Sequence, residues 1–505
     1  MATSRIVNVV DDFAHVCLHD ARANRRALDI ARELAKHPTA QVPALYGGDS
    51  GQVEAVNRFL RNERIDPEDL MGAHHAETAK RAAALDTVLV VHDTTSFRFG
   101  GGARTDMGVV DPTSSPGFYC HNSMCMTLQG EPLGLLSMQT WNRIAAVKNK
   151  QSKDQRRYDP TSEFVRWMDG FETAENAIKK VSDFGRLAPC PQVVHIADRE
   201  ADSMPFAHEA MEDGYTFIVR GKTDRRTQPS HEKCVEYLFD AVAHSPIRST
   251  QPLTVRRRVT KEVDGSPLTE SGVVGKRPRK RLVSWVETRE TSLDIRALTT
   301  RIYPGHDHHA HVPDDGMVIS VVHVRERLAP EGVTPVEWYL VTNLPVETEE
   351  QILFVVDCYR RRWLIEEYHK ALKTGCSYEA RQQRTFDNCM RMLALTVPVA
   401  VQMLRLRWFD RFSADTDARQ ILTEDQIAVL RTVRQPKNRK LPDRPTVSEA
   451  LRVVAQLGGH NRYGGPPGWL VLYRGMSKLC EMARGYRAGW DDAIRQQEKG
   501  TAEAK

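Results

Sequence analysis

TVLVVHDTTS, residues 87–96, is the stretch that indicates the fold of this chain. Its first half is a short run of β-branched and aliphatic residues, which is typical of a buried strand, and the run ends at Asp93. A second run of this kind, VVHI at residues 193–196, is followed by Ala197 and then by Asp198. We therefore predict a sheet of buried strands in which two acids stand at strand ends.

Further segments extend the predicted sheet. YTFIV, residues 215–219, precedes Arg220, and residues 124–138 have the pattern of a hairpin that turns at Gly130-Glu131-Pro132. From residue 252 to residue 339 the sequence alternates and is rich in turn residues. That pattern indicates a β-rich insertion rather than a continuation of the α/β layer.

Helical patterns flank the predicted sheet. Residues 11–36 carry Ala, Leu and Ile at spacings of three and four among charged residues, and residues 52–62 continue the pattern. Residues 347–373 lack Gly and Pro, which predicts one long helix with Gly375 as its C-terminal cap. Beyond about residue 380 the sequence predicts helices that are broken at prolines, Pro398 among them.

The composition limits the class of protein. A chain of 505 residues, with 41% hydrophobic and 27% charged residues, is ordinary for a globular protein and long enough for two or three folding units. No apolar run approaches the roughly 18 residues of a membrane span, and the first residues do not resemble a signal peptide, so we expect a cytoplasmic protein without a membrane partner. The nine cysteines are scattered without CxxC spacing, and we expect reduced thiols and no zinc site.

Basic residues are clustered, although the net charge is only +5. Each cluster alone is more often a solvated face or loop than a binding site. Because local clusters decide the attraction to a polyanion, five of them along one chain favour DNA as a partner. The clusters are RANRR (22–26), RRR (256–258), KRPRKR (276–281), RRR (360–362) and RTVRQPKNRK (431–440).

Five polar side chains share one face of the predicted long helix. The spacing of three or four residues puts them in one stripe, because an α-helix turns by about 100° per residue. The plain alternative is a set of ordinary i,i+4 ion pairs on a solvated face. The five residues are Tyr359, Arg362, Glu366, Lys370 and Lys373.

Three acids are candidate metal ligands. Asp93 and Asp198 follow strands that can converge at one sheet edge, and the long helix could add Glu366. Mg²⁺ suits a sparse set of carboxylates because it keeps several waters and also binds phosphate oxygens. The competing interpretation is that each strand-end aspartate only caps a turn or a helix.

Three motifs together resemble the DDE transposases of bacterial insertion sequences, in particular the insertion-sequence-four family typified by the transposon-five transposase. The first two are the strand followed by Asp93-Thr94-Thr95 and the segment Asp198-Arg199-Glu200-Ala201-Asp202. The third is the long and specific spacing Tyr359-x2-Arg362-x3-Glu366-x6-Lys373, which continues as WLIEEYHKALKTG. Shorter likenesses extend over nearly the whole chain: NRFLRN (57–62), FIVRGK (217–222), EWYLVT (337–342) and LGG (457–459).

The resemblance implies an α/β RNase H-like catalytic core with a β-rich insertion, flanked by helical N- and C-terminal domains. The expected boundaries are 1–75 for an N-terminal domain that reads the transposon end and 76–410 for the catalytic domain. The insertion is expected at about 223–345, and residues 411–505 are expected to form a C-terminal dimerisation domain. A homodimer on double-stranded DNA, in the bacterial cytoplasm at the nucleoid, is the implied working form.

The resemblance also implies roles for particular residues. Asp93, Asp198 and Glu366 are expected to bind two Mg²⁺ ions, with Mn²⁺ able to substitute, and so to be the catalytic residues. Trp338 is expected to stack on a base that is flipped out of the duplex. Five side chains are expected to hold DNA phosphates near the cut: Arg220, Tyr359, Arg362, Lys370 and Lys373.

The implied reaction is cut-and-paste transposition. A nick at the element end frees a 3′ hydroxyl, which attacks the opposite strand to form a hairpin; the reopened end then joins target DNA. An inactive end-binding inhibitor and a metal-dependent DNA nuclease are the alternatives, and the acid triad and Trp338 respectively argue against them.

For other polar segments the sequence leaves the function open. HDHHAH (306–311) could bind a metal, but a solvated loop is favoured there. Glu200 and Asp202 are expected either to orient the metal ligands or to cap turns.

Overall fold

The computed structural model describes residues 12–100, 106–110, 115–142, 163–185, 190–228, 236–264, 280–304, 312–381, 383, 385–433, 440–460 and 467–503. Two compact units are formed, and each is described by itself. Unit 1 comprises Met1–Ala197 and Arg360–Lys505, and unit 2 comprises Asp198–Tyr359. The HDHHAH segment and the larger part of KRPRKR lie outside the described residues.

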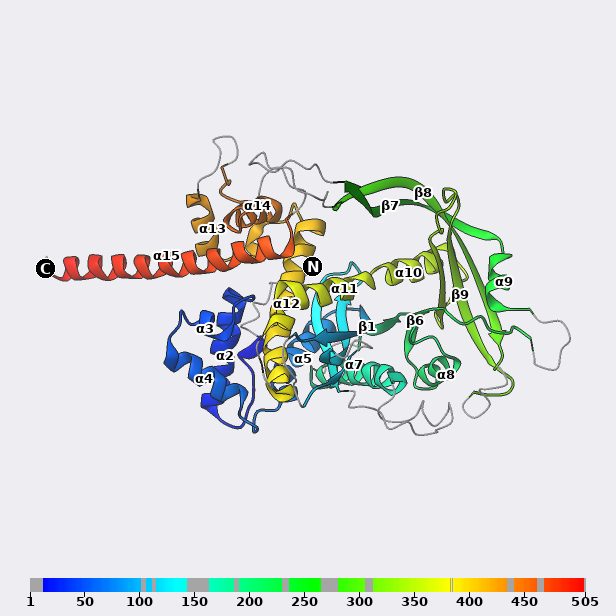
Figure 1. The fold of residues 1–505 in the computed structure, drawn as a ribbon, viewed down its shortest axis with the longest axis horizontal. Helices are drawn as coiled ribbons and strands as arrows, with labels where there is room; N and C mark the ends of the chain where they lie inside the picture. Colours follow the sequence, from blue (N-terminus) through cyan, green and yellow to red (C-terminus); the bar gives the residue numbers. More distant parts are fainter. Residues whose placement is uncertain are drawn as a thin grey trace. The chain divides into compact units, whose positions relative to one another are not determined.

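A mixed sheet forms the centre of unit 1 (Figure 1). Its strands are β1 (Thr87–Arg98), β2 (Gly108–Val109), β3 (Pro116–Thr127), β4 (Pro132–Trp141) and β5 (Gln192–Ala197). β1 pairs antiparallel with β3 and parallel with β5, while β4 and β2 pair antiparallel with β3. The β3–β4 pair confirms the predicted hairpin at Gly130-Glu131-Pro132. Helices α5 (Pro67–Ala83) and α7 (Glu163–Gly185) contribute to a shared apolar cluster with these strands.

The prediction that Asp93 closes its strand is wrong. β1 continues to Arg98 because β3 pairs with it well beyond this point, and Asp93 lies opposite Asn122 in that pairing. Such pairing comes from a distant segment, so the local pattern could not indicate it. Asp198, in contrast, follows directly after Ala197, the last residue of β5, as predicted.

Short helices build the N-terminal part of unit 1, as the pattern predicted. They are α2 (Ala21–Lys36), α3 (Val42–Leu45) and α4 (Ser50–Leu60). Asp20 caps α2 and Asp49 caps α4, in each case by accepting hydrogen bonds from two backbone N–H groups. The helix α2 buries an apolar face and leaves Arg22 and Arg25 exposed.

The predicted single helix over 347–373 is wrong. The structure has α10 (Glu349–Arg360), a break, α11 (Trp363–Lys370) and then a π-helical turn over Ala371–Gly375. After the break, the amides of Leu364 and Ile365 bond to carbonyls only three residues back, which is a tighter turn than an α-helix allows. No Gly or Pro marks this break, so the sequence pattern did not show it.

A long apolar helix, α12 (Phe386–Phe412), runs through unit 1. It contains Pro398, so the prediction of a break there is wrong, and by length and composition it could cross a membrane. This also corrects the expectation that no apolar run is long enough. However, 94% of its apolar window is buried inside the structure, as in the core helix of a globular protein.

The C-terminal part of unit 1 is helical, as predicted. α13 (Glu424–Thr432), α14 (Val447–Leu457) and the first half of α15 (Trp469–Glu503) share an apolar core with the end of α12. The far half of α15 extends away from these helices (Figure 1).

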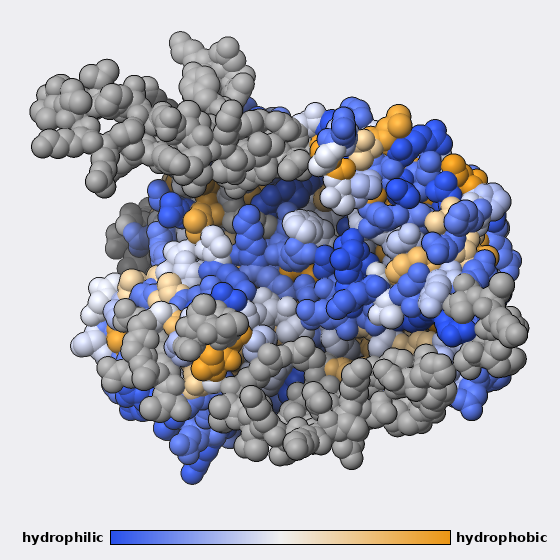
Figure 2. All heavy atoms as spheres, turned by 45° about the vertical axis from the view of Figure 1, so that its right-hand side comes forward, coloured by the Kyte–Doolittle hydropathy of each residue, from blue (hydrophilic) through white to orange (hydrophobic). Residues whose placement is uncertain are grey.

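Unit 2 contains an antiparallel sheet, in agreement with the predicted β-rich insertion. The strand order is β6 (Thr216–Arg220), β10 (Glu337–Thr342), β9 (Met317–Glu326), β8 (Lys280–Ile302) and β7 (Ile247–Asp264). Helices α8 (Met204–Glu212), α9 (Leu238–Ala243) and α10 accompany it. Hydrophilic residues predominate on the face drawn in Figure 2, with hydrophobic residues in small separate groups.

Candidate active site

Two acids of unit 1 converge on one guanidinium group. Arg362 Nη2 lies 2.5 Å from Glu366 Oε1, and Arg362 Nη1 lies 3.9 Å from Asp93 Oδ2. Asp93 comes from β1, whereas Glu366 is in the first turn of α11 and Arg362 immediately precedes that helix. The side chains of Arg362 and Asp93 are about 15% exposed, and that of Glu366 is 33% exposed, so the group opens toward solvent on the Glu366 side. Two carboxylates thus share one positive charge.

Behind Asp93, buried histidines connect the two strands that carry the acids. His92 Nε2 lies 2.9 Å from His195 Nδ1, and His92 Nδ1 is 3.0 Å from Ser123 Oγ. His195 in turn faces Glu175 of α7 across 3.5 Å. Burial lowers the pKa of His92 well below its ordinary value and also lowers that of His195, so these rings are neutral near pH 7.

The helix α7 reaches these histidines because it has a glycine at the contact. A side chain at Gly170 would place its Cβ 3.1 Å from His92 Nδ1 and from Ser123 Oγ, and 3.2 Å from His121 Nε2. Such separations are shorter than ordinary carbon contacts with polar atoms. Gly170 therefore sets how closely α7 packs on the strands that hold the candidate acids.

The third predicted acid, Asp198, belongs to unit 2. Its Oδ1 accepts a hydrogen bond from the backbone N–H of Glu200 at 2.8 Å, so the carboxylate caps its own turn in this structure. Asp202 has a clear structural role, because its carboxylate accepts bonds from the backbone N–H groups of Lys222 and Thr223 and pairs with Arg225. The turn-capping interpretation thus holds for Asp202.

Predicted DNA-contacting side chains are found on both units. In unit 2, Trp338 is half-buried and meets Tyr359 edge-on, with ring centroids 5.6 Å apart, and Tyr359 itself is only 5% exposed. Arg220 donates to the carbonyl of Glu337, next to Trp338. The indole is thus neither deep in the core nor isolated on the surface.

The two predicted lysines differ in their surroundings. Lys370 is exposed on α11. Lys373 is half-buried, its Nζ lies 5.4 Å from the centre of the Phe97 ring, and burial lowers its pKa. Both are on the segment that carries Glu366.

The fit of these residues to a divalent cation can be judged from their chemistry. Within the described part of the chain, no three His, Cys, Asp or Glu side chains gather closely enough to hold a metal ion. Asp93 and Glu366, however, are hard oxygen donors, and both lie beside the cationic Arg362. Mg²⁺ needs only one or two protein carboxylates, so this pair fits it.

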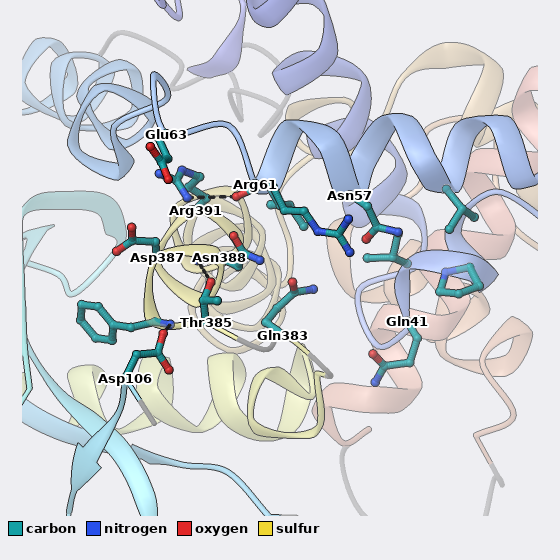
Figure 3. A pocket seen from close by; sticks show the side chains of 15 residues that line it. Gln41, Asn57, Arg61, Glu63, Asp106, Gln383, Thr385, Asp387, Asn388 and Arg391 are labelled. Carbon is teal, nitrogen blue, oxygen red and sulfur yellow. Dashed lines mark hydrogen bonds between the residues drawn. The ribbon is translucent and has the colours of Figure 1, made fainter. Parts of the chain in front are cut away.

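A large pocket lies where the N-terminal helices meet α12 (Figure 3). Its volume is about 980 Å³, and charges of both signs line it, among them Arg61, Glu63, Asp106 and Asp387. Such a mixed lining does not indicate a binding site for a polyanion.

Arginines bind the N-terminal helices to the rest of unit 1 beside this pocket. The buried Arg391 of α12 donates to the carbonyls of Leu60, at the end of α4, and of Ile65. Arg381 donates in the same way to the carbonyls of Pro38 and Ala40. These charge-assisted bonds satisfy carbonyl groups that would otherwise lack partners.

Comparisons with known proteins identify the family. A family model for transposase DNA-binding matches residues 9–65, and one for the transposase DDE domain matches residues 150–398. The second range includes Asp198 and Glu366, whereas Asp93 lies between the two ranges. A similar solved structure is the piggyBac transposase synaptic complex with hairpin DNA, determined by cryo-electron microscopy. The identity is 9%, the match covers 83% of this chain and 70% of that one, and the TM-score is 0.34.

The two family matches define a transposase that binds DNA. The clustered basic residues had favoured DNA as a partner, and the three motifs had carried the resemblance to transposases. More particularly, the chain belongs to the DDE transposases. The predicted family at this level and the predicted DNA partner are therefore confirmed.

Proposed function

We propose that this transposase is a cut-and-paste enzyme of the insertion-sequence-four type, similar to the transposon-five transposase. In this proposal it excises an element through a DNA hairpin and joins the 3′ ends to target DNA. The observation that carries the proposal is that Asp93 and Glu366 converge on Arg362, because two neighbouring carboxylates can supply oxygen ligands to a divalent cation that acts in phosphoryl transfer. The protein would act in the bacterial cytoplasm, on the DNA of the nucleoid.

Asp93, Asp198 and Glu366 would hold two Mg²⁺ ions, or Mn²⁺ in their place. Support for Asp198 comes from the chain itself, since it follows Ala197 at the end of β5, the parallel neighbour of β1. Cations bound there would lower the pKa of the attacking hydroxyl and stabilise the leaving oxygen of an in-line displacement.

The side chains of this protein would supply the rest of the site. Arg362 would exchange the two carboxylates for a DNA phosphate, to which its planar guanidinium can donate two parallel bonds. Lys370 and Lys373 would add positive charge along the same backbone, together with Arg220 and Tyr359. Trp338 would stack on the base that is extruded as the hairpin closes.

Paired ends require two copies, and the far half of α15 supports a homodimer. Four large apolar side chains follow one another at intervals of four residues and are between 39% and 55% exposed. An apolar stripe of this kind on a helix is typical of a helix-pairing surface. We call it the α15 stripe: Met482, Tyr486, Trp490 and Ile494.

The test uses the purified full chain with a supercoiled donor plasmid. The donor carries the short inverted repeats found in the DNA that flanks the coding region. In Mg²⁺, and not in EDTA, the proposal expects excised linear element, hairpin ends and joined products on a gel. An end-binding inhibitor would give only a mobility shift, and a nuclease would cut without joining; either pattern would refute the proposal.

A further inference from the structure

A histidine that the motif analysis passed over lies against the same acid. His369 is buried on α11, and its Nδ1 lies 3.9 Å from Asp93 Oδ2, the same distance as Arg362 Nη1 on the other side. Its other ring nitrogen, Nε2, is 3.2 Å from Nδ2 of Asn122. Asn122 is fully buried on β3, directly opposite Asp93 in the strand pairing. The strands β1 and β3 and the helix α11 thus meet at the carboxylate of Asp93.

The contact with Asn122 determines which nitrogen of His369 carries the proton. The amide nitrogen of Asn122 can only donate, so His369 Nε2 must accept, and the single proton of the neutral ring is then on Nδ1. The amide is oriented in this sense by Cys120, whose thiol donates to Asn122 Oδ1 at 3.5 Å.

The arrangement presents an N–H donor to Asp93 Oδ2, while Asp93 Oδ1 accepts from the backbone N–H of Thr94 at 2.9 Å. At 3.9 Å, the contacts of Asp93 Oδ2 with His369 Nδ1 and with Arg362 Nη1 are both longer than a hydrogen bond. When a cation or a DNA phosphate displaces Arg362 from the carboxylate, the Nδ1–H of His369 is a donor that stays beside Oδ2. A small rotation of the carboxylate then closes the gap.

We propose that His369 is a positioning residue that orients Asp93 for cation binding through its Nδ1–H, with Asn122 fixing the tautomer. The inference rests on the proposed function, because it takes Asp93 to be a metal ligand. Metal-binding groups are commonly oriented by such neighbours, and losing one costs about 10- to 100-fold in metal affinity or activity.

Two substitutions separate orientation from simple packing. His369→Asn can place an amide nitrogen where Nδ1 stands and so keeps a donor toward Asp93. His369→Gln can place its amide oxygen where Nε2 stands, which keeps the acceptor for Asn122 but removes that donor. Each substitution disturbs the packing around position 369. If His369 only fills space, the two variants should therefore lose Mn²⁺ binding and thermal stability to a similar extent.

The readout is Mn²⁺ binding to the full chain without DNA, followed by electron paramagnetic resonance, with thermal melting as the record of folding. We expect His369→Gln to weaken Mn²⁺ binding by about tenfold or more and His369→Asn to retain affinity within about threefold. Asn122→Leu removes the amide that keeps the proton of His369 on Nδ1 but leaves His369 itself in place. This variant should also bind Mn²⁺ more weakly. Asp93→Asn is the reference and should lose most of the affinity.

The outcomes distinguish this inference from the function on which it rests. If Asp93→Asn weakens binding while both His369 variants and Asn122→Leu bind Mn²⁺ like the unaltered protein, the positioning role is refuted and the metal assignment stands. Equal losses in the Asn and Gln variants, in step with their melting temperatures, would also refute it. Unchanged binding in Asp93→Asn would overturn both.

Discussion

Arg362 and Glu366 form an ion pair at the beginning of α11, with Nη2 and Oε1 2.5 Å apart, and the same guanidinium faces Asp93. In a transposase this pair has two consequences. It neutralises carboxylates that would otherwise repel each other, and it keeps an arginine beside the place where DNA phosphate is expected.

Replacing Glu366 by Gln should abolish strand cleavage and leave DNA binding intact, because the amide keeps the shape and loses the charge that holds a cation. Cleavage of a radiolabelled element end and a mobility-shift assay measure the two properties. Glu367→Gln is the matched control, since the neighbouring Glu367 pairs instead with Arg407 and Arg411. Normal cleavage by Glu366→Gln would show that the assignment is wrong.

Arg362→Ala should separate cation binding from catalysis. Without the competing guanidinium, Asp93 and Glu366 should bind Mn²⁺ at least as tightly as in the unaltered protein. Cleavage should nevertheless fall by about a hundredfold, the usual cost of losing one donor to a developing charge. The control is Arg361→Ala, because Arg361 donates to the carbonyl of Leu128 instead. Weaker Mn²⁺ binding in Arg362→Ala would contradict this account.

Trp338→Ala should accumulate nicked DNA at the expense of hairpin. Base stacking on an aromatic ring is worth roughly 1 to 3 kcal/mol, so hairpin formation should slow by about tenfold to a hundredfold. First-strand nicking is the internal control, and Trp338→Phe should restore part of the hairpin. A parallel loss of nicking and hairpin, with lower soluble yield, would instead indicate that Trp338 only packs against Tyr359.

Replacing three residues of the α15 stripe by Ser, at Met482, Tyr486 and Trp490, should eliminate paired-end complexes and leave single-end binding. These side chains are exposed in one chain, so their loss should not lower the melting temperature. Native gels with a labelled end measure both complexes. Arg484→Ser, which removes an exposed charge on the same helix, is the control; pairing that persists in the triple variant would refute the role of the stripe.

Gly170→Ala should destabilise unit 1 by about 1 to 3 kcal/mol, the usual cost of overpacking, because its Cβ would press on His92, His121 and Ser123. Denaturant unfolding measures the change. Gly72→Ala is the matched control: Gly72 is also helical, but nothing lies within 4 Å of its added Cβ. That substitution should stabilise the protein by up to about 1 kcal/mol. Similar effects at both positions would contradict the contact described here.

Parts of this site could be predicted from the sequence, namely those in which a local strand or helix pattern carries an acidic side chain. The strand before Asp93 and a helix at Glu366 were predictable from periodicity, whereas the roles proposed for the two acids come from the resemblance of the motifs. The extension of β1 was not, because it depends on pairing with β3. Likewise, the helix break at Arg361 and Arg362 depends on tertiary contacts, with no Gly or Pro to mark it.

Other parts of the site could not be predicted at all. His369 and Asn122 are ordinary residues within a helix and a strand, and nothing in their local sequence indicates that they meet at Asp93. The same holds for Arg391, whose partners are 326 and 331 residues away along the chain. The local sequence of an apolar helix does not show what a buried arginine binds, since only the fold brings the open carbonyls to it.

The bonds from Arg391 and Arg381 to the N-terminal helices bear on the distance between the bases that the protein recognises and the bond that it is proposed to cut. They connect the segment that matches a DNA-binding family to the other parts of the compact unit that holds Asp93 and Glu366. In the proposed function, the distance from the recognised bases to the scissile bond would therefore be set by this unit of the protein and not by a flexible tether. An element end lengthened by half a helical turn between those two points would therefore present the wrong side of the duplex to the acids.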